Sequence, residues 1–125
     1  MKRLWTALLL LTVLLGGSLS SAIRLEQFAA GLDTGLRQTD VLALSGDPEA
    51  IPALRRLLAD WEAQSAWLHV TLRHGDIDEI RSGLEEALRL LELGRKEDCS
   101  AASARIRCQL RLLARMEQLR WENLF

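Results

Sequence analysis

The segment Ile51–Leu72, IPALRRLLADWEAQSAWLHVTL, indicates the fold class most directly. Its apolar residues recur at steps of three and four, which is the spacing of residues on one helix face. This stripe comprises Ile51, Leu54, Leu58, Trp61, Ser65, Leu68 and Leu72. Trp67 lies about 120° from Trp61 around such a helix. We therefore expect Trp61 in a core and Trp67 at its shoulder, where it either covers a neighbouring helix or makes an exposed contact.

Short breaks separate this helix from its neighbours. Before it, Gly46 can end one helix, and Asp47 can cap the next with Pro48 in the first turn. After it, the helix is expected to run to about His74, with Gly75 ending it and Asp76 capping the next. The last break is Gly94–Asp98, where Asp98 is the expected cap.

The same periodicity predicts three further helices. They cover Arg24–Leu44, a stretch after Asp76, and Cys99 to about Asn123. Their stripes are, in order, Leu25, Phe28, Leu32, Leu36, Thr39 and Ala43; Ile77, Ile80, Leu84, Ala87, Leu88 and Leu91; and Cys99, Ala102, Ile106, Leu110, Leu113, Glu117, Trp121 and Leu124. Gly31 and Gly35 each weaken the first helix by roughly 1 kcal/mol relative to Ala, or let another helix approach closely.

The last helix has two unusual features. Glu117 interrupts its main stripe, and we expect this carboxylate near the open end of the bundle with an arginine such as Arg120, because a buried lone charge is costly. A second apolar stripe predicts contact with a further layer, either the first helix of the same chain, which we favour, or another subunit. It comprises Ala101, Cys108, Leu112 and Leu119.

Residues 1–23, MKRLWTALLLLTVLLGGSLSSAI, precede all of these helices. Lys2 and Arg3 are followed by the 20-residue uncharged segment Leu4–Ile23. As a helix, this segment would span about 30 Å, the thickness of the hydrocarbon core of a bilayer. A signal peptide cut near Ala22 has the same pattern of a basic start, an apolar core and small residues. We favour the retained anchor. Either way, residues 24–125 are expected outside the cytoplasm.

The sequence thus predicts an all-α protein. An N-terminal membrane anchor or signal helix is followed by an up-down antiparallel bundle of three to four helices, because short loops make neighbouring helices antiparallel. The chain has a formal net charge of −1, which becomes −3 when Lys2 and Arg3 are set aside. A nucleic-acid partner is therefore not expected, because such proteins present a basic face.

We expect no enzyme activity, metal site or cofactor. The chain lacks HExxH, CxxC, GxSxG, P-loop and dinucleotide motifs, and His69 and His74 are wrongly spaced to bind zinc from one helix face. Cys99 and Cys108 lie about 13.5 Å apart along a continuous helix, too far for a mutual disulfide. They are expected to be inert buried thiols, or else to cross-link to another molecule.

The stretch Trp67–Ile80, WLHVTLRHGDIDEI, resembles the Trp…His-x-x-Ile-Asp segment of a family of short bacterial proteins, domain-of-unknown-function family 4363. The single N-terminal apolar helix, the total length and the terminal Glu122–Phe125 are similar too. This resemblance implies an N-terminally anchored, extracytoplasmic helical protein of uncharacterised role, typical of spore-forming Gram-positive bacteria. It supplies no active-site residues.

The expected function is protein–protein contact at a membrane, with a membrane protein or a second copy of the chain. The alternative is a secreted helical bundle that binds a small apolar ligand after the leader has been cleaved. The candidate interaction residues are Trp67, His74, Asp78 and Trp121.

Overall fold

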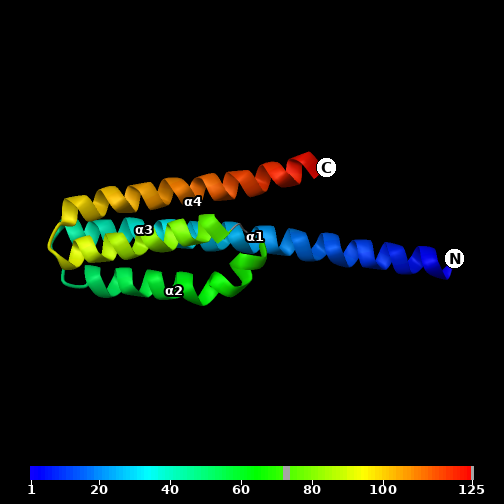
Figure 1. The fold of residues 1–125 in the computed structure, drawn as a ribbon, viewed down its shortest axis with the longest axis horizontal. Coiled ribbons are helices and arrows are strands. Elements are labelled where there is room, and N and C mark those ends of the chain that lie inside the picture. Colours follow the sequence, from blue (N-terminus) through cyan, green and yellow to red (C-terminus); the bar gives the residue numbers. More distant parts are fainter. Residues whose placement is uncertain (72–73, 125) are drawn as a thin grey trace.

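The computed structural model describes the backbone of residues 1–71 and 74–124, and the side chains of these residues except 18, 21–22, 69–71, 74, 120–121 and 124. Four helices make up this part of the chain: α1 (Lys2–Leu44), α2 (Ala50–Thr71), α3 (His74–Glu92) and α4 (Lys96–Leu124). Successive helices run in opposite directions, and α1 extends far beyond the other three (Figure 1). The all-α fold class is confirmed.

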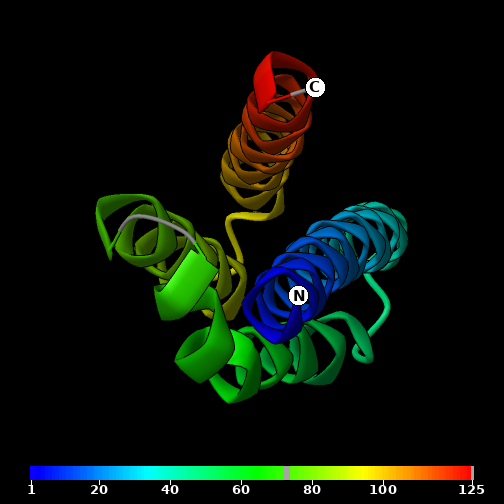
Figure 2. The same cartoon turned by 90° about the vertical axis from the view of Figure 1, so that its right-hand side faces the viewer.

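The second half of α1 packs with α2, α3 and α4 around one core (Figure 2). Each helix contacts its two neighbours, and α4 closes the bundle by packing against α1. The core consists largely of the predicted stripes, of which Leu72 and the side chains of Trp121 and Leu124 lie outside the described residues. Its largest fully buried side chains are Trp61, Leu36, Leu54, Leu68, Ile77, Ile80, Leu84, Ile106 and Cys99. The three-four periodicity therefore identifies the inward face of all four helices.

Two turns of the same kind lie at the end of the bundle opposite the N-terminus (Figure 1). Gly46 and Gly94 have φ angles of 76° and 77°, a left-handed conformation that favours glycine. In the first turn, Gly46 N donates to Ala43 O and Asp47 N donates to Leu42 O, which closes the end of α1. The Asp47 carboxylate then accepts from Glu49 N at 2.9 Å. Asp47 thus accepts a backbone hydrogen bond as a cap does, but α2 begins only at Ala50, so Pro48 precedes the helix and does not lie in its first turn.

Two predicted helix boundaries are wrong. Gly75 does not end α2, because both Gly75 and Asp76 lie in the first turn of α3, which begins at His74. Gly75 is helical and lacks the left-handed φ of Gly46 and Gly94. Asp98 does not cap α4, which already begins at Lys96. Cys99 N donates to Arg95 O, so helical hydrogen bonding starts earlier than the carboxylate.

Glycines permit close packing at two helix contacts. A Cβ atom on Gly35 of α1 would lie 2.5 Å from Leu57 Cδ2 of α2, and one on Gly83 of α3 would lie 2.9 Å from Ile106 Cγ1 of α4. At Gly31, by contrast, a Cβ atom would meet open space. Gly35 thus lets another helix approach closely, whereas Gly31 gives no such packing benefit.

Aromatic side chains join α1 to α2. The ring of Trp61 is 1% exposed and stacks on Phe28 of α1, with 5.8 Å between the ring centroids. Trp67 is half-buried and meets Phe28 edge-on at 6.4 Å. The core position of Trp61 and the shoulder position of Trp67 are confirmed.

We predict that Trp61→Ala lowers the free energy of unfolding by about 3–5 kcal/mol, because it removes a fully buried aromatic side chain. Trp67→Ala should cost visibly less, because its ring is partly solvated. Thermal and denaturant melts of the two variants measure the difference. Equal losses would contradict the packing of α2.

Candidate functional site

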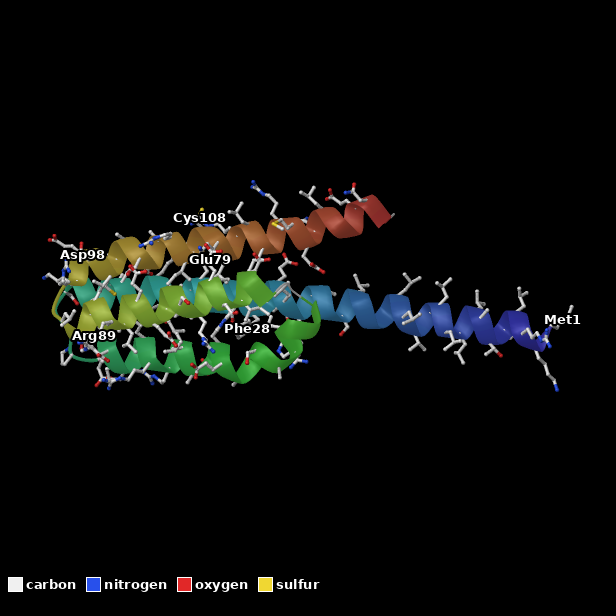
Figure 3. The ribbon with its side chains drawn as sticks, in the orientation of Figure 1. Met1, Phe28, Glu79, Arg89, Asp98 and Cys108 are labelled. Atoms are coloured by element: carbon white, nitrogen blue, oxygen red, sulfur yellow. The ribbon has the colours of Figure 1, made fainter. Side chains whose placement is uncertain are left out.

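The first part of α1 makes an apolar rod outside the bundle. Its side chains point away from the helix on all sides, and those nearest the N-terminus lie far from any other helix (Figure 3). Leu4, Leu9 and Leu14 are 74%, 65% and 67% exposed, although they lie on different sides of the helix. An isolated helix that is apolar all round is unfavourable in water. We call residues 4–23 the leader; Leu19 and Ile23, near its end, line a hollow together with residues of α4.

Helix α1 runs without a break from the leader into the bundle. It contains 43 residues, which corresponds to a length of about 65 Å. The first core side chain is Leu25, which is 3% exposed, and Arg24 is the first charged residue after Arg3. The change from an uncharged, largely apolar helix to an amphipathic one therefore occurs within two residues.

Arg24 and Trp67 meet where α1 enters the bundle. The Arg24 guanidinium carbon lies 4.8 Å from the centroid of the Trp67 ring, a cation–π contact. The Trp67 Nε1 donates to Gln64 Oε1 on the same helix. Of the four candidate interaction residues, Trp67 thus has a structural role between α2 and α1.

Of the other three candidates, Asp78 is the one whose side chain the structure describes. Asp78 is exposed on the first part of α3. His74 begins α3 and Trp121 lies near the end of α4, and both side chains lie outside the described residues. The segment that carries the family resemblance, Trp67–Ile80, is partly outside them too.

A polar seam joins α1 and α4, and sequence periodicity did not predict it. Arg107 Nε donates to Asp33 Oδ1 at 3.0 Å, and both side chains are about 80% buried. Asp33 also pairs with Arg37, at 3.2 Å. The two partners are 74 residues apart in the chain. Since the sequence shows only an arginine series along α4, nothing in the spacing distinguishes Arg107 from the solvated arginines around it.

Burial perturbs two acidic groups in the same seam. Burial raises the pKa of Asp40 above its usual value, although Ser103, Arg107 and Ser100 act in the opposite direction. Burial, together with the nearby Asp40 carboxylate, raises the pKa of the Cys99 thiol to about 11. Cys99 is therefore a neutral, buried thiol at physiological pH. No group of three metal-binding side chains occurs among the described residues.

The second apolar stripe of α4 does not pack against α1, which corrects the favoured prediction. Cys108 is exposed, and Leu112 and Leu119 are 53% and 50% exposed. Met116, between them, is 52% exposed. Helix α1 instead contacts the side of α4 that carries Arg107. Cys108 points outward from the bundle (Figure 3), so of the two cysteines only Cys99 is buried. We call Cys108, Leu112, Met116 and Leu119 the outer face of α4.

A hollow of about 390 Å³ lies where α4 passes the leader. Leu19 and Ile23 of the leader form part of its wall, and Arg111 and Arg115 of α4 form another part. Its remaining lining residues are Leu25, Glu26, Ala114, Glu117 and Gln118. Glu117 is half-buried in this open hollow, while Arg120, its suggested partner, has a side chain outside the described residues.

The sequence contained an indirect signal for this hollow. The predicted α4 is longer than the part of α1 that carries a core stripe. An antiparallel α4 must therefore continue past Leu25 and run beside the leader.

No match to this chain is found among protein-family models, curated proteins or solved structures. Within the part of the chain that the structure describes, no helix is both long enough and apolar enough to cross a membrane.

We predict that the two thiols react at different rates in the folded protein. Cys108 should react rapidly with a thiol reagent, whereas Cys99 should react only when the bundle opens, because the thiolate is the reactive form and Cys99 is buried and protonated. Rates are measured for the native chain, with Cys108→Ser as the control that leaves only the slow thiol. Two equally fast thiols would contradict the burial of Cys99.

Proposed function

We propose that this protein is a membrane-anchored helical bundle that lies outside the cytoplasm and acts through contacts with a membrane protein or a second copy of itself. The observation that carries the proposal is the leader: a continuous helix whose apolar side chains are exposed on every side. Lipid is the environment that covers such a surface completely. Lys2 and Arg3 precede it and favour a cytoplasmic N-terminus.

The residues at the start of the bundle support this placement. The uncharged segment Leu4–Ile23 is 20 residues long in the sequence, and Arg24 follows it directly. Arg24, Trp67, Arg111 and Arg115 are among the side chains found around this point, together with Glu26 and Glu117. Tryptophan and arginine commonly lie at membrane–water interfaces, where an apolar body and a polar tip are both accommodated.

The outer face of α4 supports a role in protein contacts. Three large apolar side chains, those of Leu112, Met116 and Leu119, are each about half exposed on one helix. Arginines flank them, and an apolar centre with arginine at its rim is typical of protein interfaces. We do not propose a catalytic activity, because the sequence carries no catalytic motif. The resemblance to family 4363 stays a prediction.

Cleavage near Ala22 leads to the alternative function, a secreted bundle that binds a small apolar ligand. Among the described side chains the core begins at Leu25, so a chain that starts at Ile23 would keep all of these core residues. The intact mass of the cellular protein shows whether the leader is retained or cleaved. A mass that includes residues 1–22 supports the anchor, and a chain beginning at Ile23 overturns it.

Membrane insertion is tested by a matched pair of substitutions in one helix. Val13 and Val41 of α1 are 62% and 69% exposed, the first in the leader and the second in the bundle. Val13→Arg places a charge near the middle of the proposed span, at a cost of about 2.5–3.5 kcal/mol. We expect it to weaken retention in alkali-washed membranes, while Val41→Arg leaves retention unchanged. Equal behaviour of the two variants contradicts the anchor.

The contact role is tested by cross-linking from α4. A photoreactive reagent on Cys108 should give a discrete adduct in native membranes, because this exposed thiol lies on the outer face of α4. The control is Arg56→Cys in a Cys108→Ser background, which moves the reagent to an exposed position on α2. Recovery of an uncross-linked monomer from both positions would count against the proposal.

A further inference from the structure

The hollow between the leader and α4 combines two kinds of surface. Leu19 and Ile23 provide an apolar wall, and they are 51% and 47% exposed. Arg111 and Arg115 provide two cationic groups on the facing helix. An apolar wall beside cationic groups is the chemistry that suits an amphiphilic anion.

The two arginines are one helical turn apart. Residues at i and i+4 have Cβ atoms about 5–6 Å apart, so their guanidinium groups can reach the same ligand. Like charges at this spacing repel each other, and a bound anion would relieve the repulsion. Guanidinium groups also bind phosphate oxygens in a bidentate manner.

These arginines differ from most others in the bundle. Arg37, Arg55, Arg81, Arg89, Arg95, Arg105 and Arg107 each form an ion pair with a carboxylate. Arg111 and Arg115 form none with any residue whose side chain the structure describes. Their charges are therefore available to a ligand, although Glu26 and Glu117 also line the hollow.

The position of the hollow along α1 indicates which class of amphiphilic anion would reach it. Leu19 and Ile23 belong to the last turns of the uncharged segment, and Arg24 follows them. If this segment spans the bilayer, its end lies at the level of the lipid headgroups. The arginines would then face phosphate groups, and the leucine and isoleucine would face acyl chains.

We infer that this hollow binds the headgroup of an anionic phospholipid, with Arg111 and Arg115 holding the phosphate and Leu19 and Ile23 contacting the acyl chain. The inference rests on the proposed membrane anchor and names a lipid as a further partner. The bundle would then be held against the membrane surface by α4 as well as by α1.

The test uses the full, uncut chain in detergent and short-chain phospholipids of one acyl length. Native mass spectrometry measures the binding of phosphatidylglycerol, phosphatidylcholine and inorganic phosphate. We expect the wild-type chain to bind phosphatidylglycerol about tenfold or more tightly than phosphatidylcholine, because both lipids carry a phosphate but only phosphatidylcholine also carries a cation, which the two arginines repel. Equal affinity for the two lipids would overturn the inference. Inorganic phosphate that binds as tightly as phosphatidylglycerol would show a free-phosphate site and also overturn it.

A matched pair of double variants tests whether the preference for phosphatidylglycerol comes from the hollow. Arg111→Gln with Arg115→Gln should abolish the preference for phosphatidylglycerol, with helical content unchanged by circular dichroism. The control, Arg56→Gln with Arg89→Gln, removes the same charge from α2 and α3 and should keep the preference. A preference that survives the first pair, or is lost equally in both, contradicts the site.

This test is independent of the fate of the leader in cells. Lipid selectivity is measured on the uncut chain, whereas the proposed anchor is judged from the mass of the cellular protein. A retained leader without lipid selectivity removes this inference alone. A cleaved leader removes the proposed function, whatever the purified uncut chain binds.

Discussion

The continuity of α1 is the constraint on which the rest of the structure depends. One helix carries an uncharged, largely apolar segment and then an amphipathic one, without a glycine turn or a proline between them. Its second half supplies one wall of the core, and α4 packs against that wall through the Asp33–Arg107 pair. The bundle is therefore attached directly to the leader, and the place where α4 passes the leader is fixed by the packing of the core.

Much of the fold could be predicted from the sequence, because a helix that packs against a core carries apolar residues at steps of three and four. The stripes around Leu36, Trp61 and Leu84 are buried as expected. Helix ends were harder to predict. Gly46 and Gly94 adopt left-handed turns and Gly75 does not, although all three are glycines between apolar stripes. The difference lies in backbone conformation, which residue type alone does not specify.

The candidate site was the least predictable part. The outer face of α4 has the same apolar periodicity as a packed face, yet Leu112 and Leu119 are half exposed. Periodicity shows that one side of a helix is apolar. It does not show whether a helix of the same chain or another molecule covers that side. Likewise, the sequence separates Arg115 from Ile23 by most of the chain, and only the antiparallel path of α4 brings them to one hollow.

An uninterrupted α1 also has a mechanical consequence. A helix advances about 1.5 Å and turns about 100° with each residue, and α1 stays helical from Lys2 to Leu44, through Gly16 and Gly17. Any sliding or rotation of the leader would therefore be passed to the bundle as a rigid-body displacement. Such a displacement would swing the outer face of α4 around the axis of α1, so that the direction in which this face points is set by the orientation of the first 23 residues.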